Sequence, residues 1–134
     1  MLVADSNLLA YLFIAGDKTA EVEALLKHDP EWIAPRLWRS ELLNVLALYH
    51  RVKAMPLAAC LEAFEMAEEL VGKRTYDSVS WKVLELAAQT GCSGYDSEFL
   101  SLAQEVGVRL VTYDQKLIDR SGEIACTPAE FLSR

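Results

Sequence analysis

Short apolar runs alternate along this chain with longer segments in which apolar residues recur every three or four positions. The short runs predict strands at residues 1–5, 31–35, 73–77, 108–113 and 123–126. The longer segments predict helices at residues 7–15, 18–28, 36–53, 56–71, 78–90, 95–106 and 115–120, with a capped turn at 127–132. This alternation is typical of a parallel sheet that is covered by helices on both of its faces.

Some helix boundaries are marked by residues that favour helix ends. Pro56 suits the first turn of the helix at 56–71. Asp77 is placed to act as the N-cap of the helix at 78–90. The chain contains no internal repeat, low-complexity tract or linker, so the pattern predicts one domain over residues 1–134.

Composition and charge narrow the class of protein. The chain has 134 residues, of which 52% are hydrophobic and 25% are charged, an ordinary composition for a folded globular protein. Its net charge of −7 argues against a protein that binds nucleic acid mainly through an overall positive charge. That charge is compatible with a site where acidic residues gather around a metal ion and basic residues lie beside them.

The sequence indicates neither a membrane segment nor a disulfide framework. The longest uncharged apolar run, Leu8–Gly16, is too short to span a bilayer, and the N-terminus lacks the features of a signal peptide. The three cysteines are far apart and lack the spacing of a zinc site: Cys60, Cys92 and Cys126. We therefore expect reduced core thiols in a cytoplasmic protein that does not interact with membranes.

Two acidic residues follow predicted strands. Asp5 comes directly after the apolar residues of the first strand, and Asp114 comes two residues after Thr112, where the strand that begins at Arg109 ends. In open parallel sheets ligands bind at the carboxyl ends of the strands. The glycine-rich phosphate motifs of nucleotide sites are missing. Each acid could instead cap the helix that follows it, and the two roles are compatible.

A third acidic residue lies on an apolar helix face. Residues spaced by three and four positions along the helix at 36–53 form a stripe: Leu37, Glu41, Asn44 or Val45, Leu48 and Val52. We expect this stripe to face the sheet, which would turn Glu41 inward with Asn44 aimed the same way. The alternative is a glutamate at the margin of the stripe, where its side chain reaches solvent or pairs with an arginine.

A fourth acidic residue, Asp96, begins a helix. It lies at a junction between a loop and a helix, which aims it at the end of a strand. The alternative is structural: the run from Ser93 to Asp96 resembles a capping box, in which the acid reaches back to the start of its own helix.

Four segments together resemble a known family. "LVADSNLLAYLF", "SELLNVLAL", "GYDSEFLSLAQEVGVRLVTYD" and "QKL" are similar, in order and spacing, to a PIN domain, and within it to VapC-type toxin ribonucleases of toxin–antitoxin pairs. The resemblance covers essentially the whole chain. It implies a three-layer α/β/α sandwich with a central parallel sheet.

The resemblance also implies a site. It assigns Asp5, Glu41, Asp96 and Asp114 as catalytic residues that hold Mg²⁺ or Mn²⁺. It further implies that three polar neighbours orient the acids: Ser6, Asn44 and Thr112. Physical chemistry agrees, because two carboxylates about 4 Å apart repel by roughly 4 kcal/mol at an effective dielectric constant of about 20. Hard oxygen ligands without cysteine or histidine favour Mg²⁺ or Mn²⁺.

The function implied by the resemblance is cleavage of RNA phosphodiesters by a metal-activated water. The implied partners are an RNA substrate, a cognate antitoxin protein and a second copy of the chain in a homodimer. Arg36, Arg39 and Lys116 are candidates for contacts to the RNA backbone. The chain departs from the family's pattern at Tyr113, which is bulkier than the small residue expected, and in its acidic net charge.

Two alternatives compete with this interpretation. The first is a catalytically inactive PIN-like module that only binds proteins, and the presence of all four acids argues against it. The second is a phosphatase-like enzyme on an open α/β sheet, which would need a nucleophilic aspartate in a DxD pattern. The sequence "DSN" at residues 5–7 does not supply that pattern.

Overall fold

The computed structural model describes all 134 residues. Five short parallel strands form one sheet in the order β3-β2-β1-β4-β5. The strands are β1 (Leu2–Ala4), β2 (Trp32–Pro35), β3 (Thr75–Tyr76), β4 (Leu110–Val111) and β5 (Ala125–Cys126). Eight α-helices surround them: α1 (Ser6–Phe13), α2 (Thr19–His28), α3 (Trp38–Lys53), α4 (Leu57–Val71), α5 (Ser80–Thr90), α6 (Gly94–Val106), α7 (Gln115–Ser121) and α8 (Pro128–Leu132).

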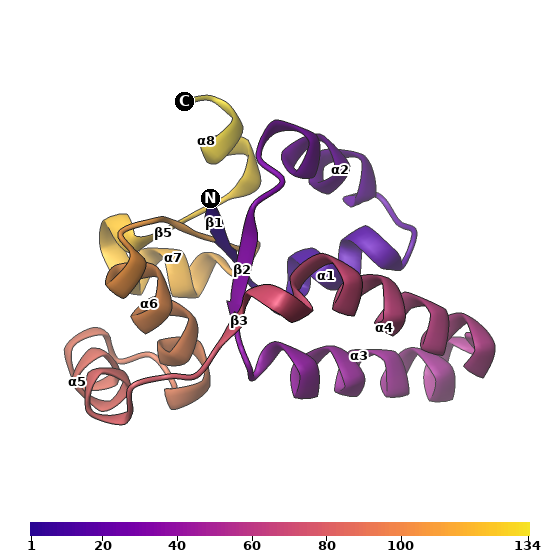
Figure 1. Cartoon of the computed structure of the whole chain (residues 1–134), viewed down its shortest axis with the longest axis horizontal. Helices are drawn as coiled ribbons and strands as arrows, with labels where there is room; N and C mark the ends of the chain where they lie inside the picture. The colour runs from indigo at the N-terminus through magenta and orange to yellow at the C-terminus, as the bar shows by residue number, and fades with distance from the viewer.

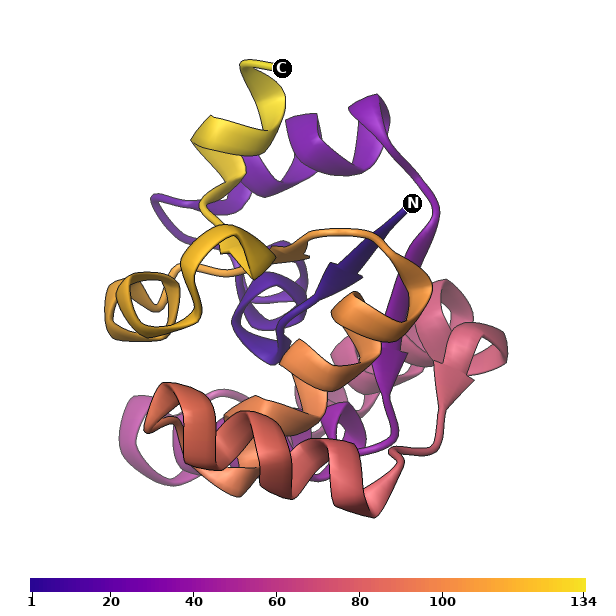
Figure 2. The ribbon, with the colours of Figure 1, turned by 90° about the vertical axis from the view of Figure 1, so that its left-hand side faces the viewer.

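The helices form a layer on each side of the sheet. In Figure 1, α5 and α6 lie to the left of the strands, while α1, α3 and α4 lie to the right. Helix α6 packs across β1, β2 and β4, and α5 packs on the outside of α6. Figure 2 shows the chain from the α5–α6 side, with β1 behind α6. The predicted three-layer α/β/α sandwich with a parallel sheet is confirmed.

The core lies between the central strands and the inner faces of the helices. Its largest fully buried side chains include Trp32, Trp38 and Phe99. All three cysteines are free and buried, as the sequence predicted. No helix is long and apolar enough to cross a membrane.

Several predicted boundaries were wrong in detail. Helix α5 begins at Ser80 after the non-polar cap Val79, so Asp77 does not cap it. The Asp77 carboxylate instead accepts a hydrogen bond from Arg36 Nε at 2.8 Å. The first half of the predicted last strand belongs to a 3₁₀ turn at Gly122–Ile124, and its second half, Ala125–Cys126, pairs with β4. Strands of two residues suffice here because the sheet is stabilised by burial under the helices and does not need long runs of hydrogen bonds between strands.

Candidate functional site

Asp5 lies at the carboxyl end of β1, the centre of the sheet, and only 8% of it is exposed. Its carboxylate caps α1 by accepting a hydrogen bond from Ser6 N at 2.8 Å. Burial raises the pKa of Asp5 to about 6, and the nearby charges of Glu41 and Asp96 add to this rise. The hydrogen bond from Thr112 and the one from Ser6 oppose it. The helix-capping role of Asp5 is therefore present, and its role as a ligand of a metal ion stays a prediction.

Ser6 joins Asp5 to Glu41. Its hydroxyl donates to Glu41 Oε1 at 2.5 Å and lies 3.3 Å from Asp5 Oδ1. A serine hydroxyl has one hydrogen, so the short contact to Glu41 takes it and the contact to Asp5 is weak. This bond fixes the first turn of α1 against the first turn of α3, although the two residues are 35 positions apart in the chain.

Glu41 is half-buried, and burial raises its pKa, with the charges of Asp96 and Glu98 acting in the same direction. The hydrogen bond from Ser6 acts in the opposite direction. The charge of Asp96 on α6 therefore acts on Glu41 on α3, although the two helices are far apart in the chain.

The predicted apolar stripe of α3 was wrong beyond its first turns. The buried residues of this helix are Trp38, Leu42 and Leu46, whereas Leu48 is 45% exposed and Val52 is 63% exposed. Helix α3 runs past the edge of the sheet, so its second half packs against helices and not against strands (Figure 1). Glu41 therefore lies at the margin of the buried face, as the alternative proposed, yet it turns toward Ser6 and the acids rather than toward solvent.

Asp96 is the third residue of α6, and the cap of that helix is Ser93, whose hydroxyl accepts from Asp96 N at 3.0 Å. Burial raises the pKa of Asp96, and the charge of Asp114 raises it further. The hydrogen bond with Ser93 and the charge of Arg120 act in the opposite direction. The Asp96 carboxylate accepts no hydrogen bond from Ser93 N, so the second bond of a capping box is not formed.

Asp114 caps α7 through one carboxylate oxygen. Its Oδ1 accepts from Lys116 N at 3.1 Å and from Leu117 N at 3.2 Å. The other oxygen accepts no hydrogen bond within the chain. The cap thus fixes the side chain while leaving Oδ2 available.

Thr112 is fully buried and connects the two strand ends. Its hydroxyl donates to Asp5 Oδ2 at 2.7 Å. The hydroxyl oxygen of Thr112 in turn accepts hydrogen bonds from Asp114 N at 3.0 Å and from Asn7 Nδ2 at 3.1 Å. With its donor and both lone pairs in use, the hydroxyl can point only toward Asp5. Thr112 therefore holds one oxygen of Asp5, and its predicted role of orienting a metal ligand stays a prediction.

Asn7 was missed by the sequence analysis. Its amide donates to Thr112 and its Oδ1 accepts from Tyr113 N at 3.4 Å, so it ties the start of α1 to the end of β4. A polar residue two positions after a strand-end aspartate was the only available signal. Asn44, in contrast, is exposed and makes no hydrogen bond to the acids. Its orienting role stays a prediction.

The donor set suits a hard divalent cation, because all four acids offer only oxygen. Asp5 accepts two short hydrogen bonds, which leave lone pairs on both of its oxygens. As the side chains lie, however, no three acidic, histidine or cysteine groups are close enough to enclose a metal ion. Asp96 and Asp114 are partly exposed, so their side chains have room to change conformation.

The sequence matches the PIN domain over residues 2–123, a range that includes all four acids. The chain belongs to the PIN-domain family. Ribonuclease VapC3 of Pyrobaculum aerophilum is 26% identical over 125 residues, which cover 89% of this chain and 93% of that protein. This PIN domain is thus a distant homologue of a VapC ribonuclease.

Solved structures share the fold. PAE2754 from Pyrobaculum aerophilum superposes with a TM-score of 0.78 over 99% of this chain and 94% of its own, at 22% identity. A toxin–antitoxin complex from Klebsiella pneumoniae gives 0.71 over 96% of this chain and 98% of the other, at 17% identity. FitAcB from Neisseria gonorrhoeae superposes with a TM-score of 0.74 over 96% of this chain and 99% of its own, at 14% identity.

Proposed function

We propose that this PIN domain is a divalent-metal-dependent endoribonuclease, the toxin of a toxin–antitoxin pair. The observation that carries the proposal is a set of three acids from different elements whose pKa values are each raised by burial and by the charge of at least one other acid: Asp5, Glu41 and Asp96. Such a cluster is destabilising unless a cation or protons neutralise it. Membership of the PIN family and the distant homology to a ribonuclease support the same activity.

Asp5, Glu41 and Asp96 would hold the cation, with Asp114 joining through its free Oδ2. When bound, Mg²⁺ or Mn²⁺ lowers the pKa of a water and balances the charge that develops on a phosphodiester. The chain's own contribution is orientation: Ser6 and Thr112 hold the Asp5 carboxylate by hydrogen bonds at its two oxygens. Ser6 also holds Glu41, so two of the proposed ligands move as one unit.

The substrate we propose is single-stranded or loop RNA. Arg36, Arg39 and Lys116 remain the candidates for phosphate contacts. Arg36 pairs with Asp77, and Arg39 pairs with Glu68, so each arginine must exchange a carboxylate for a phosphate. These exposed pairs are worth about 0–1 kcal/mol each, so the exchange costs little.

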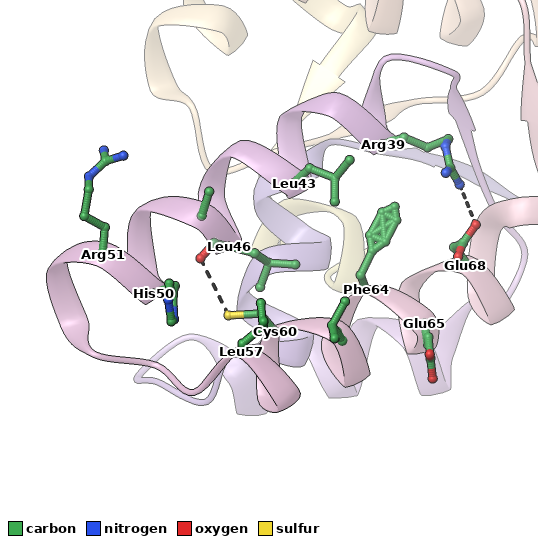
Figure 3. Close-up of a pocket in the computed structure, with 12 residues that line it drawn as sticks. Arg39, Leu43, Leu46, His50, Arg51, Leu57, Cys60, Phe64, Glu65 and Glu68 are labelled. Atoms are coloured by element: carbon green, nitrogen blue, oxygen red, sulfur yellow. Dashed lines mark hydrogen bonds and ion pairs between the residues drawn. The ribbon is translucent and has the colours of Figure 1, made fainter.

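We further propose that a cognate antitoxin covers the groove between α3 and α4. This groove has a volume of about 960 Å³ and is lined by leucines that no other element covers, among them Leu43, Leu57 and Leu61 (Figure 3). An amphipathic helix is the partner that such a groove suits. The structural neighbour from Klebsiella pneumoniae is a toxin–antitoxin complex, which supports a partner of this kind. Helix α2 has no large exposed apolar side chain, so it does not add to this surface.

The decisive experiment is cleavage of a mixed pool of labelled single-stranded RNA. We expect wild type to cut with Mn²⁺ or Mg²⁺ and to stop in excess EDTA. Glu41→Gln should be inactive, whereas Glu69→Gln, the same change at an exposed α4 position, should cut normally. Full activity in EDTA would refute metal dependence. An inactive wild type would instead favour the alternative, a PIN-like module that only binds proteins.

A further inference from the structure

A second pocket lies between the first turns of α5 and α6, away from the α3–α4 groove. It has a volume of about 610 Å³. Tyr95 and Leu84 form an apolar side, with 67% and 70% of their surfaces exposed. Ser78 and Ser93 contribute hydroxyls, and Asp77 and Glu98 contribute carboxylates.

This pocket adjoins the acidic cluster. Tyr95 directly precedes Asp96, and Ser93, which lines the pocket, caps α6 by accepting from Asp96 N. Glu98, which also lines the pocket, lies two residues after Asp96 on α6 and accepts from Ser78 Oγ at 2.7 Å. A strand whose phosphate lies at the acids can therefore place a neighbouring group in the pocket.

The lining selects against a phosphate. It contains no lysine, arginine or histidine, and its two carboxylates would repel an anion. Asp77 is already paired with Arg36. Glu98 Oε1 accepts from Ser78 at 2.7 Å, whereas its Oε2 accepts no hydrogen bond within the chain.

The lining favours a flat group that donates hydrogen bonds. An exposed tyrosine stacks on any nucleobase. A carboxylate accepts hydrogen bonds from the amino group of cytosine but faces the carbonyl O4 of uracil unfavourably. Adenine and guanine also carry such donors.

We propose that the pocket between α5 and α6 binds one nucleobase of the RNA strand, stacked on Tyr95, and prefers an amino-bearing base such as cytosine to uracil through Glu98. The inference rests on the proposed ribonuclease activity for its substrate class. The pocket would give the protein a preference among bases, which the acidic cluster alone does not provide.

Free nucleosides test the pocket without metal and without cleavage. In a titration followed by ¹H–¹⁵N NMR, cytidine should shift the amides of Gly94, Tyr95 and Glu98, and uridine should bind at least about fivefold more weakly. Glu98→Gln should make the two affinities similar, because its amide can also donate to O4. Glu62→Gln, the same change on the exposed face of α4, should keep the preference.

Tyr95 has its own pair of variants. Tyr95→Phe should bind cytidine like wild type, and Tyr95→Ala should bind roughly tenfold more weakly, as loss of a stacking aromatic does. Equal binding of cytidine and uridine to wild type would overturn the proposal. So would shifts of these amides that follow protein concentration rather than nucleoside, since the face would then be an interface between copies.

The pocket proposal and the nuclease proposal can be refuted independently of each other. A wild type that cuts RNA with Mn²⁺ but binds neither nucleoside overturns the pocket alone. A wild type that prefers cytidine but cuts no RNA overturns the nuclease and supports a base-binding site.

Discussion

Replacing Asp5 by asparagine should change how the stability of the metal-free protein depends on pH. The pKa of Asp5 is about 6 in the folded protein against an ordinary value of 3.8. Because the folded value is raised, the stabilising contribution is complete below the unfolded pKa and is lost as pH rises through the folded one. Between about pH 4 and about pH 8 this loss amounts to about 2 kcal/mol. The asparagine variant should not show it.

Asparagine also disturbs the hydrogen bonds at this position. Its oxygen can still accept from Ser6 N, but its amide would face Thr112, whose hydroxyl oxygen already accepts from Asn7 and Asp114 N. An unpaired buried donor costs about 1–3 kcal/mol. This cost does not depend on pH, so the comparison between pH values, rather than the stability at one pH, carries the test.

The assay is urea unfolding in EDTA, monitored through the fluorescence of the buried Trp32 and Trp38. Between about pH 4 and about pH 8, wild type should lose about 2 kcal/mol of unfolding free energy that Asp5→Asn does not lose. Asp119→Asn, the same change at an exposed residue, should follow wild type throughout. Parallel profiles for wild type and Asp5→Asn would refute the raised pKa and, with it, the unneutralised cluster.

Three further outcomes are expected. Thr112→Val should lower the free energy of unfolding by about 1–3 kcal/mol, and by more at high pH than at low pH, because the charged Asp5 carboxylate loses its buried donor; an unchanged urea midpoint would contradict this. In thermal melts, Mn²⁺ at a hundredfold excess over its Kd should stabilise wild type by roughly 2.7 kcal/mol and Glu41→Gln by less; equal gains would make Glu41 a structural residue. Light scattering should show a homodimer, and a strictly monomeric species would count against that partner.

The order of elements followed from the sequence pattern, whereas the joint role of the four acids stays a prediction. Apolar runs ending in Asp5 and Asp114 predicted two carboxylates at the same edge of a parallel sheet, and β1 and β4 are indeed neighbours. Such predictions succeed because the strand period and the helix period are properties of local sequence.

Other features depend on where one element ends against another. The exposure of Leu48 and Val52 could not be predicted, because the apolar pattern of α3 does not say where the helix leaves the sheet. The bonds of Asn7 join positions more than 100 residues apart, and its amide carries no signal in the local pattern. Tertiary contacts decided both.

The central claim is that the acidic cluster is a divalent-metal site, and calorimetric titration of Mn²⁺ tests it most directly. At neutral pH we expect saturable binding to wild type and to Asp119→Asn. Asp96→Asn, which keeps the Ser93 cap of α6, should bind at least about tenfold more weakly because it removes a charged oxygen ligand. Equal affinity in Asp96→Asn and wild type, or no binding to wild type, would contradict the claim.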